Sequence, residues 1–119
     1  MHVDKQIDEL ELDSHLVELA VEVFGMLADA TRIRLVLALR EGELSVNHLA
    51  DIVDRNPATV SQHLAKLRLA RMVTTRKQGT TVFYALADEH ALQLVTDAVL
   101  QAEHTVDAVP RHHRPAEGE

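Results

Sequence analysis

The sequence predicts a mainly α-helical domain with a small β-hairpin, a winged helix-turn-helix that dimerises through its terminal helices. Three observations predict it. Apolar residues recur every three or four positions along most of the chain. A short turn joins two helical segments within residues 45–69, and a Val/Thr-rich stretch with a central glycine follows them. At 119 residues the chain is long enough for one domain with a real core.

The N-terminal third holds two predicted helices. Residues 1–12 are charged and weakly periodic, so we expect them to form a flexible acidic arm. Asp13–Ser14 can cap a first helix, and Asp29 a second that stops at Gly42. The first helix has an apolar stripe with helical spacing: Leu16, Leu19, Ala20, Val23, Phe24 and Leu27.

The middle of the chain predicts the helix-turn-helix and its wing. Ser45 can cap the first of its helices, and Asn56 with Pro57 marks the start of the second. The expected core positions of these two helices are Val46, Leu49, Ala50, Val53, Val60, Leu64 and Leu67. The hairpin is predicted to pair Val73–Arg76 with Thr80–Ala85 across Lys77-Gln78-Gly79.

The last predicted helix runs from about Asp88 to His104, so residues 13–104 form the domain and 105–119 a His-containing C-terminal tail. One face of this helix carries small residues that would allow a second copy to approach closely: Ala91, Val95, Ala98 and Ala102. We expect a homodimer joined there.

Charge is distributed unevenly along the chain. The net charge is −7, yet residues 55–87 contain no acidic residue and six basic ones. The remainder carries six basic and 19 acidic residues, and +6 with −13 gives −7. A basic middle between acidic ends indicates a polyanion-binding face, and for a helix-turn-helix the expected polyanion is double-stranded DNA.

The second helix of a helix-turn-helix enters the major groove. With its apolar positions inward, its opposite face presents Thr59, Gln62 and Lys66. Gln62 can pair with adenine, and Lys66 with guanine or phosphate. The predicted DNA-binding residues are Thr59, Ser61, Gln62, His63, Lys66, Arg68, Arg76 and Lys77. Alternatively, His63 is a half-buried structural histidine. The wing, likewise, has the alternative interpretation of a solvated turn without a DNA contact.

Histidines gather near the C-terminus. His90 and His104 are about 21 Å apart along one helix at 1.5 Å per residue, so they cannot share an ion within a chain. In an antiparallel pair centred near Asp97, each His90 would meet the partner's His104. The candidate ligands are His90, Glu103, His104, His112 and His113, with Asp88 as a further candidate. Alternatively, Asp88 caps the helix and His104 interacts with its dipole.

The donor set restricts the metal. Imidazole and carboxylate without sulfur suit Ni(II) or Co(II), with Zn(II) possible, and do not suit Cu(I), Cd(II) or arsenite. The absence of cysteine and of any long apolar run predicts a cytoplasmic protein without a membrane span. There is no nucleophile–base pair, so we expect no enzyme. The alternative is a winged-helix regulator controlled by a protein partner, with incidental metal binding.

The strings "MLADATRIRLVLAL", "GELSVNHLA", "PATVSQHLAKLRLARMV" and "RKQGTTVFYAL" resemble the ArsR/SmtB family of bacterial metal-responsive repressors. The resemblance covers roughly residues 21–104. It implies a dimer that binds an operator and is released by an inducing metal. The thiolate sensors of the family carry cysteines where this chain has Ser45 and Asn47, so it lacks that site.

The pattern of an early histidine in the last helix, Glu-His at its end and His-His in the tail is similar to that of actinobacterial nickel/cobalt sensors of this family. This similarity implies a Ni(II)/Co(II) site of higher coordination number, over which the tail folds. It also implies that metal binding releases the repressor from DNA.

Overall fold

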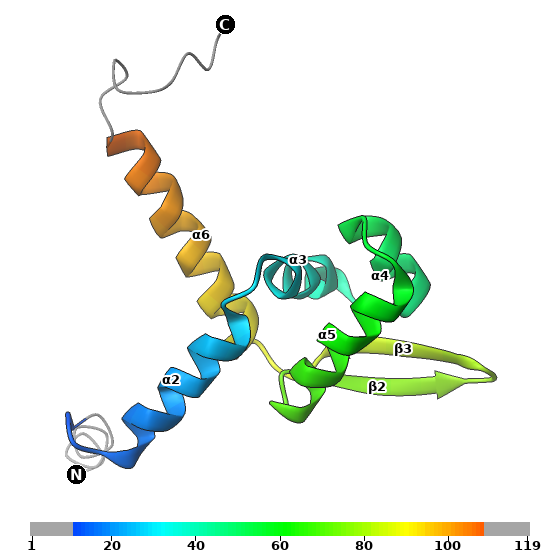
Figure 1. Cartoon of the computed structure of the whole chain (residues 1–119), viewed down its shortest axis with the longest axis horizontal. Coiled ribbons are helices and arrows are strands. Elements are labelled where there is room, and N and C mark those ends of the chain that lie inside the picture. The colour runs from blue at the N-terminus through cyan, green and yellow to red at the C-terminus, as the bar shows by residue number, and fades with distance from the viewer. Residues whose placement is uncertain (1–10, 109–119) are drawn as a thin grey trace, which may run out of the picture.

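The computed structural model describes residues 11–108 and confirms the predicted fold class. Helices surround a small sheet, and the β2–β3 hairpin projects from the body as a wing (Figure 1). The elements, in chain order, are α2 (His15–Leu27), α3 (Ala30–Ala38), the 3₁₀ turn η1 (Leu39–Glu41), β1 (Leu44–Ser45), α4 (Val46–Val53), α5 (Pro57–Leu69), β2 (Val73–Gln78), β3 (Thr81–Leu86) and α6 (His90–Ala108).

Four of the helices begin where a side-chain oxygen can satisfy a free backbone N–H. Ser14 accepts from the N–H of Leu16 at 3.1 Å, and Ser45 from that of His48 at 3.2 Å. The same role is filled by Asp29 before α3 and Asn56 before α5. The predicted caps of these four helices are therefore confirmed.

The turn between α4 and α5 is short because α4 ends with a left-handed residue. Asp54 has φ 56°, which allows the N–H of Arg55 to reach back to the carbonyl of Ala50 at 3.1 Å. Asn56 then caps α5, with Pro57 in its first turn. The chain thus reverses within three residues, and α5 lies against α4 as a helix-turn-helix requires.

The sheet has one strand more than the predicted hairpin. Its order is β1-β3-β2, both pairs antiparallel, with Leu44 opposite Tyr84 and Val73 opposite Leu86. β1 has only two residues, too few to show the alternation by which strands are recognised in a sequence. β2 also continues to Gln78, so the turn is Gly79–Thr80 rather than the predicted 77–79. Gly79 has φ 63°, the conformation that such a tight turn favours in glycine.

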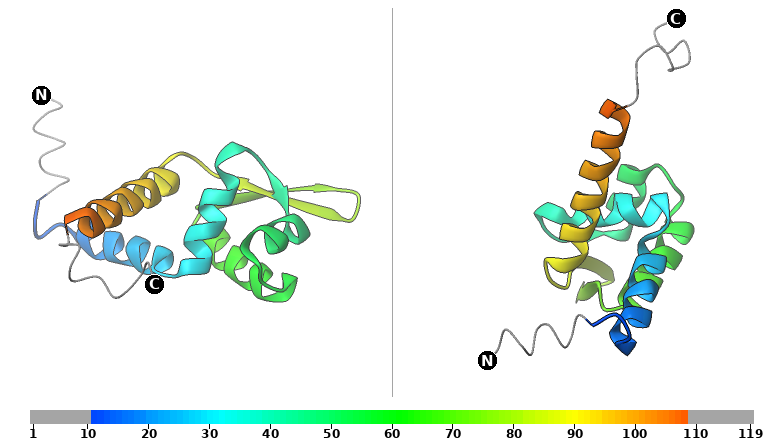
Figure 2. Two further views of the ribbon diagram at one scale, coloured as in Figure 1. Left: turned by 90° about the horizontal axis from the view of Figure 1, so that it is seen from above. Right: turned by 90° about the vertical axis from the view of Figure 1, so that its left-hand side faces the viewer.

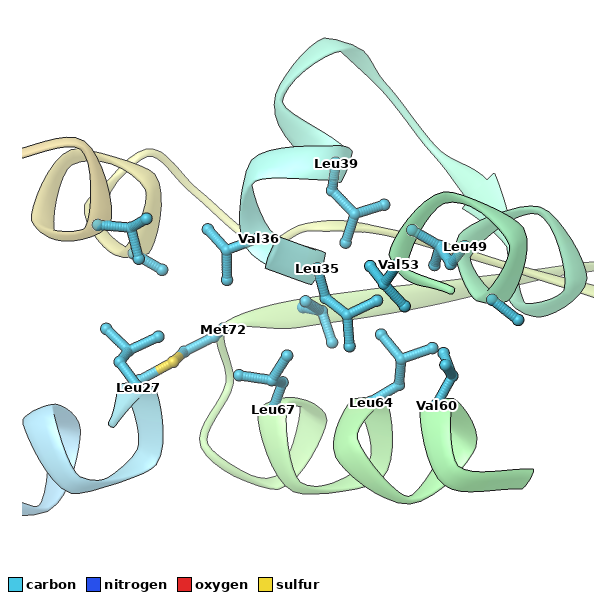
Figure 3. Close-up of a cluster of buried hydrophobic side chains, with 14 residues drawn as sticks. Leu27, Leu35, Val36, Leu39, Leu49, Val53, Val60, Leu64, Leu67 and Met72 are labelled. Atoms are coloured by element: carbon cyan, nitrogen blue, oxygen red, sulfur yellow. The ribbon is translucent and has the colours of Figure 1, made fainter. Parts of the chain in front are cut away.

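The core lies where α3 meets the helix-turn-helix (Figure 3). Val60, Leu64 and Leu67 point from α5 toward Leu35 of α3, and all four are fully buried. Leu49 and Val53 of α4 close one side of this cluster, and Leu27 with Met72 the other. The core predicted for α4 and α5 is confirmed except at Val46, which is only partly buried.

The apolar stripe of α2 has the predicted helical spacing, but most of it is exposed in the protomer. Leu19 is 47% exposed and Phe24 59%, whereas Leu27 is buried. Only the C-terminal end of α2 reaches α3, and the rest of the helix extends away from the domain (Figures 1 and 2). Helical periodicity identified the apolar face of α2 correctly, but within residues 11–108 nothing covers most of that face.

A second correction concerns α6. Ala91 and Val95 are 5% and 2% exposed because the first half of α6 packs on α3, so they are unavailable to a partner. Farther along, Ala98, Val99, Leu100 and Ala102 are exposed. α2 and α6 each contact α3, and they run apart at the end of the molecule opposite the wing (Figure 1). Among residues 11–108, no helix is both long and apolar enough to cross a membrane.

Candidate functional site: the recognition helix, the wing and α6

The exposed face of α5 carries most of the residues of this helix that were predicted to bind DNA. Ser61, Gln62, Lys66 and Arg68 are exposed, and Thr59 is partly buried next to the cap of Asn56. Because Val60, Leu64 and Leu67 fix the opposite face in the core, the outward direction of these side chains is determined by packing. α5 can therefore present polar and basic groups to a major groove without rearrangement.

His63 is the exception on this helix. Its side chain is only 18% exposed, and its Nδ1 accepts a hydrogen bond from Nε of Arg32 at 3.1 Å. The same Nδ1 lies 3.9 Å from the carboxylate of Asp29. These contacts support the interpretation of His63 as a structural histidine. Arg32 and His63 also line a shallow groove of about 410 Å³ together with Gln62, Ala65 and Lys66.

The pKa of Asp29 is lowered from its ordinary value. The first cause is the hydrogen bond from the backbone N–H of Arg32, and the charges of His63 and Arg32 contribute in the same direction. A carboxylate at the start of α3 also interacts favourably with the helix dipole. Asp29 is thus held ionised beside the recognition helix.

Arg76 lies within β2, in the strand that was predicted to span Val73–Arg76. Its Nε donates to Glu43 at 3.0 Å, its Nη1 to Gln78 at 2.9 Å, and its guanidinium lies 4.8 Å from the ring centroid of Phe83. The hydrogen bond with Glu43 lowers the pKa of that carboxyl and raises the pKa of Arg76. Lys77 beside it is exposed on the wing.

The acid-free segment forms a continuous part of the fold, since residues 55–87 comprise α5, β2 and β3. Glu43 comes from outside that segment and places a carboxylate on the wing. Neither Arg32 nor Glu43 was among the predicted site residues. The only sequence feature that could have indicated Arg32 is its position three residues after the capping residue Asp29. No sequence feature indicates Glu43.

α6 places three candidate metal ligands on an exposed helix. His90 is its first residue, and Glu103 and His104 lie near its far end, all exposed. The helix continues past the predicted end at His104 to Ala108. His104 is therefore not in the final turn, where the dipole effect is concentrated, so a purely structural explanation of this histidine is weakened.

Asp88 caps α6, which was the alternative to its being a metal ligand: its Oδ1 accepts a hydrogen bond from the N–H of His90 at 2.9 Å. Within residues 11–108 of a single chain, no three His, Asp or Glu side chains come close enough to hold a metal ion. The candidate ligands His112 and His113 lie outside the described residues.

Comparison with known proteins decides the family. Residues 29–75 match the pattern described as "Bacterial regulatory protein, arsR family". The chain is 54% identical over 118 residues to the HTH-type transcriptional regulator KmtR of Mycobacterium tuberculosis, covering 99% of this chain and 89% of that one.

The chain belongs to the ArsR/SmtB family.

Other members agree with this assignment. The repressor SmtB of M. tuberculosis is 40% identical over 87 residues, with 73% of this chain and 64% of that one covered. The solved structure of the antimony-specific repressor AntR matches with a TM-score of 0.74 at 28% identity, covering 86% of this chain and 94% of that one. A homodimeric winged helix-turn-helix DNA-binding domain from Mycobacterium bovis matches with a TM-score of 0.69 at 26% identity, covering 84% and 90%.

As an ArsR/SmtB member, the chain is a DNA-binding transcriptional regulator and not an enzyme. The predicted family and its DNA-binding role are therefore confirmed. DNA binding and homodimerisation are typical of the family.

Proposed function

We propose that the chain is a homodimeric repressor that binds operator DNA through α5 and the wing, senses Ni(II) or Co(II), and leaves the operator when the metal binds. The observation that carries this proposal is the exposure of His90, Glu103 and His104 on one continuous helix that lacks a complete site of its own. The similarity to the transcriptional regulator KmtR over nearly the whole chain supports the DNA-binding part of the proposal.

The second copy would pack against the exposed faces of α2 and α6. Leu16, Leu19 and Phe24 on α2 and Val99 and Leu100 on α6 are exposed in the protomer. Burying apolar side chains removes their surface from water, at about 25 cal/mol per Å². An antiparallel pairing of the two α6 helices centred near Asp97 would bring each His90 to the partner's His104.

The available side chains fit a hard or borderline divalent ion. Imidazole nitrogens and a carboxylate, with no cysteine in the chain, are suitable ligands for Ni(II), Co(II) or Zn(II). His112 and His113 would add two nitrogens to the set, which favours the six-coordinate geometry of Ni(II) and Co(II) over tetrahedral zinc. The ion would supply a bridge between helices of the two protomers.

Metal can release DNA only if it binds the DNA-free dimer more tightly than the operator complex. Allosteric coupling of about 1–3 kcal/mol corresponds to a roughly 5- to 150-fold loss of operator affinity. The proposed change is in the spacing of the two α5 helices, since both must fit successive major grooves at once.

The decisive experiment is metal titration of the wild type beside His112→Ala/His113→Ala, with operator affinity and metal coordination number as readouts. The double variant should bind Ni(II) more weakly and lose the allosteric response, while its metal-free DNA affinity stays unchanged. His48→Ala, an exposed histidine on α4, is the matched control and should bind metal as the wild type does. Unchanged operator affinity of the wild type at saturating Ni(II) and Co(II) would show the sensing proposal to be wrong.

A further inference from the structure

Arg32 connects three helices through one guanidinium. It lies in the first turn of α3, its Nε donates to Nδ1 of His63 in the middle of α5, and its Nη1 donates to the backbone carbonyl of Met26 near the end of α2 at 3.2 Å. The same nitrogen lies 3.4 Å from the Met26 sulfur. The side chain is partly buried, so these bonds are shielded from water on one side.

The contact with Met26 uses a group that α2 leaves free. α2 ends at Leu27, and the last four carbonyls of a helix have no partner within it. The planar guanidinium can hold this carbonyl and the His63 ring at the same time, which a single ammonium group cannot do with the same geometry. The end of α2 and the centre of the recognition helix are therefore linked by one rigid group.

The bond also determines which nitrogen of His63 carries the proton. A neutral imidazole has one donor and one acceptor nitrogen. Because Nδ1 accepts from Arg32, the proton of the neutral ring is on Nε2. Protonation of Nδ1 would replace the acceptor by a donor facing another donor and would break the link.

We propose that Arg32 is a positioning residue for DNA recognition, which holds α5 in register with α2 through the Nδ1 atom of His63. The orientation of the exposed, DNA-binding face of α5 then depends on the position of α2, the helix at which the two protomers are proposed to meet. This inference rests on the proposed DNA-binding and dimer faces, and not on metal sensing. It assigns His63 an indirect role in operator binding rather than a contact with the bases.

Two substitutions of His63 separate positioning from direct contact. The amide oxygen of His63→Asn lies close to the position of Nδ1 and can accept from Arg32, whereas the longer side chain of His63→Gln places its amide near Nε2. The probe is the duplex that the wild type selects from a random-sequence pool, at fixed salt. We expect His63→Asn to stay within about threefold of wild-type affinity, and His63→Gln to lose about tenfold or more, because losing a hydrogen bond to a charged group costs about 1.5–3 kcal/mol. The reverse order, or an equal loss in both, would overturn the proposal.

Arg32→Lys changes the donor of the hydrogen bond between Arg32 and His63 and provides a second test. It keeps the positive charge but not the paired donors, so it should lose affinity as His63→Gln does while retaining a wild-type urea midpoint. If Arg32→Lys binds the selected duplex as the wild type does, the positioning role is excluded. Failure of the wild type itself to select any duplex would instead contradict the proposed function.

Discussion

Glu43 and Arg76 form an ion pair that joins the loop before β1 to the wing. Two nitrogens of the guanidinium donate to the carboxylate, and Phe83 lies beneath the same group. Arg76 belongs to residues 55–87, which contain no acidic residue, so Glu43 neutralises one of the six basic groups of that segment. Its effect on DNA binding can be measured directly.

Removing the carboxylate should strengthen binding to DNA of any sequence. In Glu43→Gln the charge of Arg76 becomes available to a phosphate, and each neutralised phosphate steepens the plot of log K against log salt by about 0.9. Fluorescence anisotropy with a random duplex across a salt series measures both quantities. Glu41→Gln makes the same charge change in η1, and an equal effect in this control would mean that net charge, not the ion pair, is responsible.

Gln62 and Lys66 should contribute to DNA binding in different ways. Gln62→Ala is expected to relax preference at one base pair by about 1–3 kcal/mol, because a base-edge hydrogen bond is lost. Lys66→Ala should weaken all duplexes similarly and reduce the salt slope by about 0.9, as expected for a phosphate contact. Competition binding with single-base variants of the selected duplex distinguishes them. A uniform loss in Gln62→Ala would contradict its assignment to base recognition.

The exposed stripe of α2 should be necessary for dimerisation. Leu19→Glu places a charge on a surface that the proposed dimer buries, and an unpaired buried charge is strongly unfavourable. Sedimentation velocity should show a monomer at concentrations where the wild type is a dimer. Ile52→Glu is the control, since Ile52 on α4 is 51% exposed and lies outside the proposed interface. Retention of the dimer in Leu19→Glu would exclude this face of α2.

Arg71 ends α5 in a conformation that glycine adopts more easily. It has φ 63°, and the N–H groups of Arg71 and Met72 return to the carbonyls of Arg68 and Leu67 at 2.9 Å. Arg71→Gly should therefore raise the free energy of unfolding by about 0.5–1 kcal/mol, as a left-handed non-glycine residue costs about 1–2 kcal/mol and glycine costs entropy in the unfolded chain.

Urea unfolding at one protein concentration measures this change, since dimerisation makes apparent stability depend on concentration. Arg68→Gly removes the same side chain from a helical position and should lower stability by about 1 kcal/mol. Equal changes in the two variants would show that backbone conformation is not the cause.

Asp29 should make stability depend on acid pH. Its native pKa lies below the ordinary value of 3.8, so the unfolded state binds more protons as the pH falls. The contribution of the carboxylate is complete above that value and is lost as pH falls through the native pKa. Asp29→Asn keeps the cap without titrating. Its stability should gain on the wild type between pH 5 and pH 3 by about 0.3–1 kcal/mol, the size of a charge–dipole interaction. If the difference in free energy of unfolding between the two proteins is the same at pH 5 and pH 3, Asp29 does not contribute to the acid dependence of stability.

The fold was predictable from local features. A cap such as Asn56 acts within three residues, and the periodicity of Val60, Leu64 and Leu67 reflects a face that must be buried somewhere. What covers a face is a property of the whole fold. The helix period therefore does not say whether Leu19 is buried within the protomer, and Val95 is buried where a partner was expected.

The site was predictable only in part for the same reason. Exposed Gln62 and Lys66 follow from the helix period once the buried face is known. Arg32 meets His63 across 31 positions and Arg76 meets Glu43 across 33, and no pattern of spacing records such contacts. Among the predicted metal ligands, His90, Glu103 and His104 are exposed, but their meeting depends on a second chain.

The order of the strands gives Arg76 and Lys77 on the wing a second role, apart from DNA binding. β2 is an outer strand, paired only with β3 within the described part of the chain. An outer strand offers unpaired backbone groups to any other extended chain, and charged side chains on it discourage aggregation. Arg76, paired with Glu43, and the exposed Lys77 place charged side chains on this strand, which oppose such pairing. Neutralising both would leave a six-residue strand open to intermolecular pairing, and the variant would precipitate as its concentration rises.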